Sequence, residues 1–178
     1  MEKKDLAKEI YNKSHLTGEF LLRSGQKSNE YFDKYLFESD PKLLMAIIKE
    51  MKLLIPKDTE VIAGLEMGGI PLVTALSIET GLASAFVRKN AKEYGTCKIA
   101  EGNEIKGKKL CVIEDVVTTG GQIIKSVQEL RDRGAIIENV LCVIQRNKEA
   151  SEILEKENLC LKPIFTMDYI KEIVNKEK

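Results

Sequence analysis

The sequence predicts an α/β fold in which a central, mostly parallel sheet is flanked by helices and accompanied by a small N-terminal arm, about residues 1–38. Short apolar runs alternate with segments of helical spacing through the middle of the chain, a pattern typical of parallel strands joined by right-handed crossover helices. The chain has 178 residues, of which 43% are hydrophobic and 31% are charged. These values predict one domain over residues 1–178 with a substantial core.

The N-terminal arm is expected to begin with a charged amphipathic helix. The next stretch, GEFLLRSGQKSNEYFD (residues 18–33), predicts short strands around a turn at Ser24-Gly25. Ser39-Asp40-Pro41 then predicts a helix start, because aspartate caps helix N-termini and proline fits the first helical position. The apolar face of that helix follows helical spacing: Leu43, Leu44, Ile47, Ile48 and Met51.

Strands and helices alternate from residue 61 onward. One helix is predicted over Leu72–Thr80, ending at Gly81, a second between residues 123 and 134, and a last one after Thr166. The intervening stretch Arg88–Lys109 is polar and unusually long for a compact domain, which suggests a functional role. The predicted strands are 61–65, 83–87, 110–113, 140–144 and 161–165.

Charge and cysteine content disfavour several classes of function. Lys+Arg and Asp+Glu both number 28, so no global field favours nucleic acid or a membrane surface. No apolar run reaches membrane-spanning length, and the start of the chain lacks an apolar signal core. The cysteines Cys97, Cys111, Cys142 and Cys160 form no CxxC pair, which predicts free thiols in a reducing cytoplasm. His15 is the single histidine, so a histidine zinc site or nucleophile relay is not expected.

Residues 111–122, CVIEDVVTTGGQ, carry the strongest functional pattern. A strand that ends in Glu114 and Asp115 opens into the loop Thr118–Gln122 before a helix. Glycines let backbone N–H groups converge beside the helix N-terminus, which favours a phosphate, while carboxylates accept hydrogen bonds from ribose hydroxyls. Both together predict a ribose 5-phosphate unit. Neither GxxxxGK[ST] nor GxGxxG is present, which favours one monophosphate. The alternative is an ordinary acidic turn with a glycine break.

Three segments resemble a known family. IEDVVTTGG resembles the phosphoribosyl pyrophosphate (PRPP) signature of type I phosphoribosyltransferases. FVRKNAKEYGTCKIAEG (86–102) and FLLRSGQKSNEYFD (20–33) resemble the mobile catalytic loop and the substrate-covering hood of orotate phosphoribosyltransferases. The resemblance spans nearly the whole chain and implies the type I phosphoribosyltransferase fold.

The resemblance also implies an activity. The expected reaction transfers ribose 5-phosphate from PRPP to orotate, giving orotidine 5′-monophosphate and pyrophosphate in de novo pyrimidine synthesis. Mg²⁺ is expected, bound mainly through PRPP, with no protein metal ligands assigned. A cytoplasmic homodimer is expected, in which the mobile loop of one subunit reaches the PRPP site of the other.

Roles follow from the resemblance, position by position. The expected catalytic residues are Lys92, Asp115, Glu114 and Arg88. The expected PRPP-binding residues are Arg23, Met67, Gly68, Arg88, Lys89, Lys92, Tyr94, Glu114, Asp115, Val116, Val117, Thr118, Thr119, Gly120, Gly121 and Gln122. The expected orotate-binding residues are Tyr31, Phe32, Thr118 and Arg146. The turn Glu66–Gly69 is expected to line the pyrophosphate through backbone N–H groups.

The chain departs from the family pattern at two positions. Many members carry lysine where this chain has Gly68, and histidine where it has Tyr94. The first change removes a fixed positive charge from the pyrophosphate turn. The second exchanges a titratable donor for a phenol, which still donates a hydrogen bond.

Two other functions are compatible with the pattern. One is transfer to a different nucleobase, which would leave the charge of Arg146 unpaired. The other is a PRPP-sensing regulator without turnover, which would not need the cationic loop starting at Arg88 and Lys89. That loop has its own simpler interpretation as a solvated basic surface, and Tyr31 and Phe32 could belong to a strand core.

Overall fold

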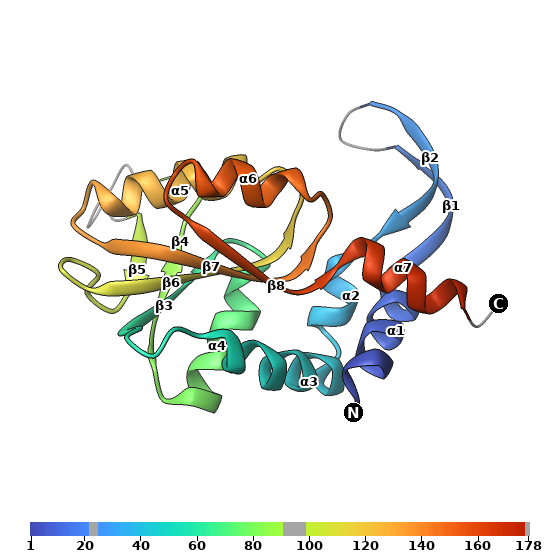
Figure 1. Cartoon of the computed structure of the whole chain (residues 1–178), viewed down its shortest axis with the longest axis horizontal. Helices are drawn as coiled ribbons and strands as arrows, with labels where there is room; N and C mark the ends of the chain where they lie inside the picture. The colour runs from blue at the N-terminus through green and yellow to red at the C-terminus, as the bar shows by residue number, and fades with distance from the viewer. Residues whose placement is uncertain (22–24, 91–98, 177–178) are drawn as a thin grey trace.

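The computed structural model describes residues 1–21, 25–90 and 99–176. Within these residues the main sheet has six strands in the spatial order β5-β4-β3-β6-β7-β8 (Figure 1). Strand β5 pairs with β4 in antiparallel fashion, and the other neighbouring strands pair in parallel. This arrangement confirms the predicted mostly parallel α/β sheet. The strands are β3 (Val61–Leu65), β4 (Ala83–Val87), β5 (Ala100–Gly102), β6 (Lys109–Val117), β7 (Ile136–Gln145) and β8 (Cys160–Thr166).

Helices cover both faces of this sheet (Figure 1). Helices α3 (Pro41–Met51) and α4 (Gly69–Thr80) lie on one face, and α5 (Gly121–Arg131) and α6 (Glu149–Glu155) lie on the other. Successive strand residues point to opposite faces, so Ile62 packs with α3 and α4 while its neighbour Ala63 packs with α5. The 3-10 turn η1 (Lys52–Leu54) follows α3. No helix in the described part of the chain is both long and apolar enough to cross a membrane.

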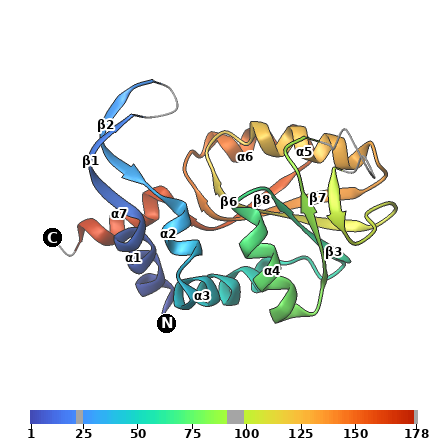
Figure 2. The ribbon, with the colours of Figure 1, turned by 180° about the vertical axis from the view of Figure 1, so that it is seen from behind.

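The N-terminal arm forms the hood, which we define as residues 1–38. It comprises α1 (Lys3–Ser14), the antiparallel hairpin of β1 (His15–Leu21) and β2 (Lys27–Phe32), and α2 (Lys34–Glu38). The hairpin projects from the body of the molecule beside α7 (Met167–Asn175), as the two opposite views show (Figures 1 and 2). Helices α1 and α7 are in contact, so segments from both ends of the described chain meet at the base of the hood.

Local capping explains where two helices begin. The carboxylate of Asp40 accepts hydrogen bonds from the backbone N–H groups of Lys42 and Leu43, and Pro41 occupies the first turn of α3. Thr166 accepts a hydrogen bond from the N–H of Tyr169 at the start of α7. Both helix starts confirm the sequence-based prediction, because the cap side chains satisfy N–H groups that the helix leaves unpaired.

Four expectations about individual elements need correction. Strand β6 does not end at the acid pair but continues to Val117, where it still pairs with Gln145 of β7. The stretch Arg88–Lys109 is not wholly irregular, since it contains β5. The short helices α2 and α6 were not expected. Asp115 therefore lies inside β6, and the alternation of side chains along the strand determines which face of the sheet it points to.

Candidate active site

The loop Thr118–Gln122 after β6, which we call the phosphate loop after its expected ligand, has a backbone suited to an anion. Gly120 has a left-handed backbone, with φ of 80°, and directly precedes the first residue of α5. A side chain there would also lie 3.2 Å from Leu154 of α6, so glycine fits both the conformation and the space. Thr118 and Thr119 are exposed at the start of the loop, beside the helix N-terminus. This arrangement places hydroxyl and N–H donors together where a helix dipole favours an anion.

The turn Glu66–Gly69 lies next to this loop at the same edge of the sheet. A β-carbon on Gly69 would be 2.4 Å from the carbonyl oxygen of Ile113, so the turn and β6 approach each other closely. Glu66 donates its N–H to the carbonyl of Val87 (2.8 Å), and its carboxylate accepts a hydrogen bond from the N–H of Lys89. These bonds fix the turn to the end of β4. Met67 is 61% exposed.

Asp115 does not face the open loop. Its side chain is fully buried, and Oδ1 accepts a hydrogen bond from the N–H of Val116 (2.5 Å). Its Oδ2 lies 2.5 Å from Nζ of Lys34, on α2 of the hood. A β-carbon on Gly68 would fall 1.5 Å from the same Oδ2. Gly68 therefore provides the room that Asp115 occupies, although its own backbone, at φ −67°, does not require glycine.

Carboxyl groups are concentrated around Asp115. Glu38 of α2 is 5% exposed, and burial, the charge of Asp115 and hydrogen bonding to it raise the pKa of Glu38 to about 9. Glu114 accepts a hydrogen bond from the N–H of Asp115 (3.0 Å), and desolvation together with Asp115 raises its pKa well above the ordinary range. Burial alone would lower the pKa of Lys34. The hydrogen bond and charge interaction with Asp115 and the charge interaction with Glu114 outweigh burial and raise this pKa.

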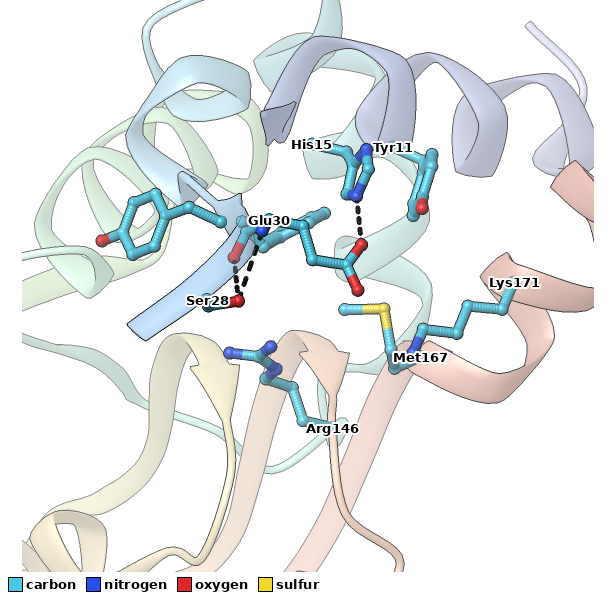
Figure 3. A pocket seen from close by; sticks show the side chains of 9 residues that line it. Tyr11, His15, Ser28, Glu30, Arg146, Met167 and Lys171 are labelled. Carbon is cyan, nitrogen blue, oxygen red and sulfur yellow. Dashed lines mark hydrogen bonds and ion pairs between the residues drawn. The ribbon is translucent and has the colours of Figure 1, made fainter. Parts of the chain in front are cut away.

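A cavity of about 250 Å³ lies between the hood, β7 and α7 (Figure 3). It is lined by Tyr11, His15, Ser28, Glu30, Tyr31, Phe32, Arg146, Met167 and Lys171. Arg146 rises into the cavity from the end of β7, and its backbone N–H donates to the carbonyl of Val117 (2.7 Å). That bond joins the cavity to the strand that carries the phosphate loop. His15 Nε2 lies 2.6 Å from a carboxylate oxygen of Glu30.

The structure thus brings together three of the four residues expected to contact orotate. Tyr31 is 44% exposed and lines the cavity with Arg146, so it is not a strand-core residue. Phe32 lines the cavity and also packs against the core. Thr118 does not line the cavity and belongs to the neighbouring phosphate loop.

The cationic loop is described only in part. Arg88 lies at the end of β4 and forms an ion pair with Glu101 of β5 (3.3 Å). Lys89 is exposed beside it. Three residues with expected roles, Arg23, Lys92 and Tyr94, lie outside the residues that the structure describes.

Several site residues escaped the sequence analysis. Lys34 and Glu38 were not proposed, although Asp33 is a helix-capping residue and the four-residue spacing places both on one helical face. His15 was assigned no role at the site. It follows α1, stacks on Tyr11 at 4.6 Å and lines the cavity. No sequence pattern indicated Met167 or Lys171, because only the folded chain brings α7 to the hood.

Whether the protein itself could hold magnesium depends on its side-chain ligands. The described residues contain no group of three or more histidine, cysteine, aspartate or glutamate side chains arranged to hold a metal ion. Magnesium ions commonly retain waters and bind substrate phosphates instead of a full set of protein ligands. An ion that arrives bound to a polyphosphate substrate would not need such a group.

The fold and the phosphate loop define a class, and comparison with known proteins agrees with it. A sequence model of the family described as Phosphoribosyl transferase domain matches residues 37–174, so the chain is a phosphoribosyltransferase. An orotate phosphoribosyltransferase from Nocardioides sp. is 47% identical over 161 residues, covering 90% of each chain. One from Methanocella arvoryzae is 42% identical over 142 residues, covering 80% of this chain and 81% of the other. The chain belongs to the orotate phosphoribosyltransferase family.

Solved structures support the same family. A crystal structure of Mycobacterium tuberculosis orotate phosphoribosyltransferase superposes with a TM-score of 0.85 at 28% identity, covering 94% of this chain and 98% of the other. A structure of orotate phosphoribosyltransferase from the same organism in complex with PRPP gives a TM-score of 0.81 at 26% identity, covering 95% and 98% of the two chains.

Proposed function

We propose that the protein transfers ribose 5-phosphate from PRPP to orotate, producing orotidine 5′-monophosphate and pyrophosphate for pyrimidine synthesis. The observation that carries this proposal is a backbone hydrogen bond that connects the cavity to the phosphate loop. Arg146, in the cavity, donates its N–H to Val117, which directly precedes the phosphate loop. A planar base and a ribose phosphate can therefore lie side by side, as transfer between them requires.

The phosphate loop is proposed to hold the 5-phosphate of PRPP. Thr118 and Thr119 supply hydroxyl donors, and the N-terminus of α5 supplies N–H groups and partial positive charge. The turn Glu66–Gly69 lies beside this loop and is proposed to face the pyrophosphate. This arrangement stretches PRPP along the carboxyl edge of the sheet, the usual ligand position in open α/β folds.

The protein's contribution to the reaction is electrostatic. Departure of pyrophosphate leaves positive charge on the ribose and builds negative charge on the leaving group. Asp115 is proposed to stabilise the charge on the sugar, and Glu114 to hydrogen-bond a ribose hydroxyl. Arg88, Lys89 and Lys92 are proposed to stabilise the departing anion. Magnesium, bound mainly through PRPP, would neutralise part of the pyrophosphate charge. Lys92 is assigned through family resemblance alone.

Arg146 is proposed to select the base. Orotate carries a carboxylate, and a guanidinium binds carboxylates through paired, charge-assisted hydrogen bonds. Tyr31 and Phe32 line the same cavity and supply aromatic surface for the pyrimidine ring. A base without a carboxylate would leave Arg146 unpaired in the cavity. The proposed substrate is therefore orotate and not uracil or a purine.

A base screen tests the proposal. The protein would be incubated with PRPP, Mg²⁺ and either orotate, uracil, adenine or hypoxanthine, and pyrophosphate release would be followed. Orotate should give much the fastest release, with orotidine 5′-monophosphate as the product. Faster release of pyrophosphate with another base would make that base the proposed substrate in place of orotate. Binding of PRPP without turnover on any base would favour a PRPP-sensing protein.

We also propose that the active unit is a homodimer in which residues 88–102 of one subunit serve the PRPP site of the other. Support comes from the family resemblance and from the charge at the start of this stretch. Arg88 and Lys89 are carried by the end of β4, at the same sheet edge as the turn Glu66–Gly69.

A further inference from the structure

Helix α2 of the hood contacts Asp115, the second residue of the acid pair, through the side chain of Lys34. Asp33 caps this short helix by accepting a hydrogen bond from the N–H of Tyr35 (3.1 Å). The cap fixes Lys34 and Glu38 four residues apart, on the same side of the helix. Lys34 makes its 2.5 Å ion pair with Asp115, and Glu38 is buried against the same carboxylate. Both contacts link the hood to the strand before the phosphate loop.

Burial favours the neutral forms of Glu38 and Glu114 in this cluster. Glu38 has no donor from another described residue at either carboxyl oxygen. Burial and the neighbouring Asp115 raise the pKa of Glu38 to about 9, so Glu38 is neutral near pH 7. The charged groups acting on Glu38 are Asp115 of β6 and Lys34 and Asp33 of its own segment. A neutral Glu38 leaves the ammonium of Lys34 to compensate Asp115.

The turn leaves room for this arrangement. Oδ2 of Asp115, the atom that contacts Lys34, occupies the space where a side chain at position 68 would begin. The ammonium of Lys34 consequently lies at the pyrophosphate turn, although it comes from the hood. The turn Glu66–Gly69 has no lysine of its own, and Lys34 of α2 supplies a positive charge beside it.

We propose that Lys34 and Glu38 are positioning residues for the PRPP reaction, which hold the Asp115 carboxylate against the turn Glu66–Gly69 and thereby tie PRPP binding to the seating of the hood. This inference rests on the proposed function. Without Lys34, Asp115 would be a buried carboxylate beside a second acid with no ammonium partner, and its side chain would rotate away from the turn Glu66–Gly69. The carboxylate would then no longer be held in place for PRPP.

Charge removal at Lys34 is the direct test. Lys34→Met keeps the length of the side chain, Lys34→Arg keeps its charge, and Lys49→Met on the exposed side of α3 is the matched control. Calorimetry would give the dissociation constant for PRPP with Mg²⁺, and steady-state kinetics would give both KM values. Lys34→Met should weaken PRPP binding about tenfold or more, because small displacements of site groups have effects of this size. The KM for orotate should change less than about twofold.

Rescue and pH dependence separate positioning from simple structural damage. Lys34→Arg should recover most of the PRPP affinity, and Glu38→Gln should retain it because an amide also donates a hydrogen bond. Glu38→Leu should lose it. In the wild type, PRPP affinity should fall as pH rises through about 9, where Glu38 loses its proton, and this fall should be absent in Glu38→Gln.

The outcomes distinguish this inference from the proposed function. Wild-type PRPP affinity in Lys34→Met, or tighter binding, would overturn the positioning role and leave the enzyme assignment intact. A wild-type protein that neither binds PRPP nor turns over orotate would overturn both. If Lys34→Met fails to fold, Gly68→Ala replaces it, since the added methyl group displaces Oδ2 of Asp115 without altering Lys34. Unchanged PRPP affinity in that variant would also overturn the positioning role.

Discussion

At the scale of single residues, Arg146 is the group on which the proposed choice of orotate depends. Its position at the end of β7 follows from strand pairing, and its side chain enters the cavity between the hood and α7 (Figure 3). The carboxylate of Glu30 lies in the same cavity and pairs with His15. The cavity therefore contains one acid that already has a partner and a guanidinium for which no side-chain partner is recorded among the described residues.

Replacing Arg146 should separate the two substrates. Arg146→Met should raise the KM for orotate about tenfold or more, because two charge-assisted hydrogen bonds would be lost. The KM for PRPP should change less than about twofold, since the phosphate loop is untouched. Arg133→Ala, at an exposed position after α5, is the control. An unchanged orotate KM in Arg146→Met would show that the guanidinium does not contact the base.

Glu38 should leave a pH signature in stability as well as in binding. Its pKa in the folded protein, about 9, lies above the ordinary value of 4.5, so the folded state retains a proton that the unfolded state releases. Stability from this group is complete below about 4.5 and is lost as pH rises towards 9. Glu38→Gln removes this titration.

The Glu38→Gln melting temperature should therefore exceed that of the wild type by more at pH 8 than at pH 5. The added difference should be on the order of 10 °C, from about 4 kcal/mol of proton linkage between these pH values and roughly 2–4 °C for each kcal/mol in a chain of this length. Thermal unfolding followed by circular dichroism at several pH values would measure it. Parallel curves for the two proteins across this range would indicate that Glu38 is ionised in the folded state.

At the scale of elements, the turn between β3 and α4 combines two glycines with different tasks. Gly69 approaches the backbone of β6, where the contacted atom is the carbonyl oxygen of Ile113. Gly68 approaches only the side chain of Asp115. A backbone contact cannot yield without moving the strand, whereas a carboxylate can rotate. The two positions should therefore respond differently to the same substitution.

Alanine at each glycine gives the comparison. Gly69→Ala should lower the melting temperature substantially, because a methyl group would overlap the backbone of the central sheet. Gly68→Ala should lower the melting temperature less, because only the Asp115 side chain has to move, but should weaken PRPP binding about tenfold. Both properties would be measured on the same preparations. Equal loss of stability in both variants would mean that Asp115 cannot move, contrary to this account.

The sequence determined some elements closely and others poorly, for physical reasons. Strands β3 and β4 matched their predicted bounds because each is a mostly apolar run that a charged residue, Glu66 or Arg88, follows directly. Strand β6 was predicted too short, because acidic residues ordinarily end strands and only pairing with β7 carries it to Val117. Helix α2 has five residues, too few for a helical period to appear, so the prediction missed Lys34 and Glu38.

At the scale of the whole molecule, the proposed shared site can be tested by mixing two inactive proteins. Lys92→Ala and Asp115→Asn should each be nearly inactive alone. If Lys92 acts on the partner's PRPP while Asp115 acts on its own, mixed dimers would contain one site with both groups and one with neither. Activity should reappear after subunit exchange, towards about one quarter of the wild-type level if exchange is random and complete, since half the dimers are then mixed.

Two measurements control this experiment. Exchange would be confirmed by mass spectrometry of differently tagged subunits, and mixing wild type with itself under the same conditions would correct for losses. Activity that remains at the parental level despite complete exchange would place Lys92 in the site of its own subunit. Such a result would leave the orotate phosphoribosyltransferase family assignment unaffected.

The cavity joins parts of the chain that are made at very different times during translation. Tyr11 of α1 and Ser28 of β2 leave the ribosome early, whereas Met167 and Lys171 of α7 leave it more than 130 residues later. Lys3, near the start, even lies 5.6 Å from the ring centre of Phe165. If folding proceeds from the N-terminus, α1 remains without its contacts to α7 until α7 has been synthesised. A nascent chain arrested before residue 167 could complete its phosphate loop and still have no place for a base.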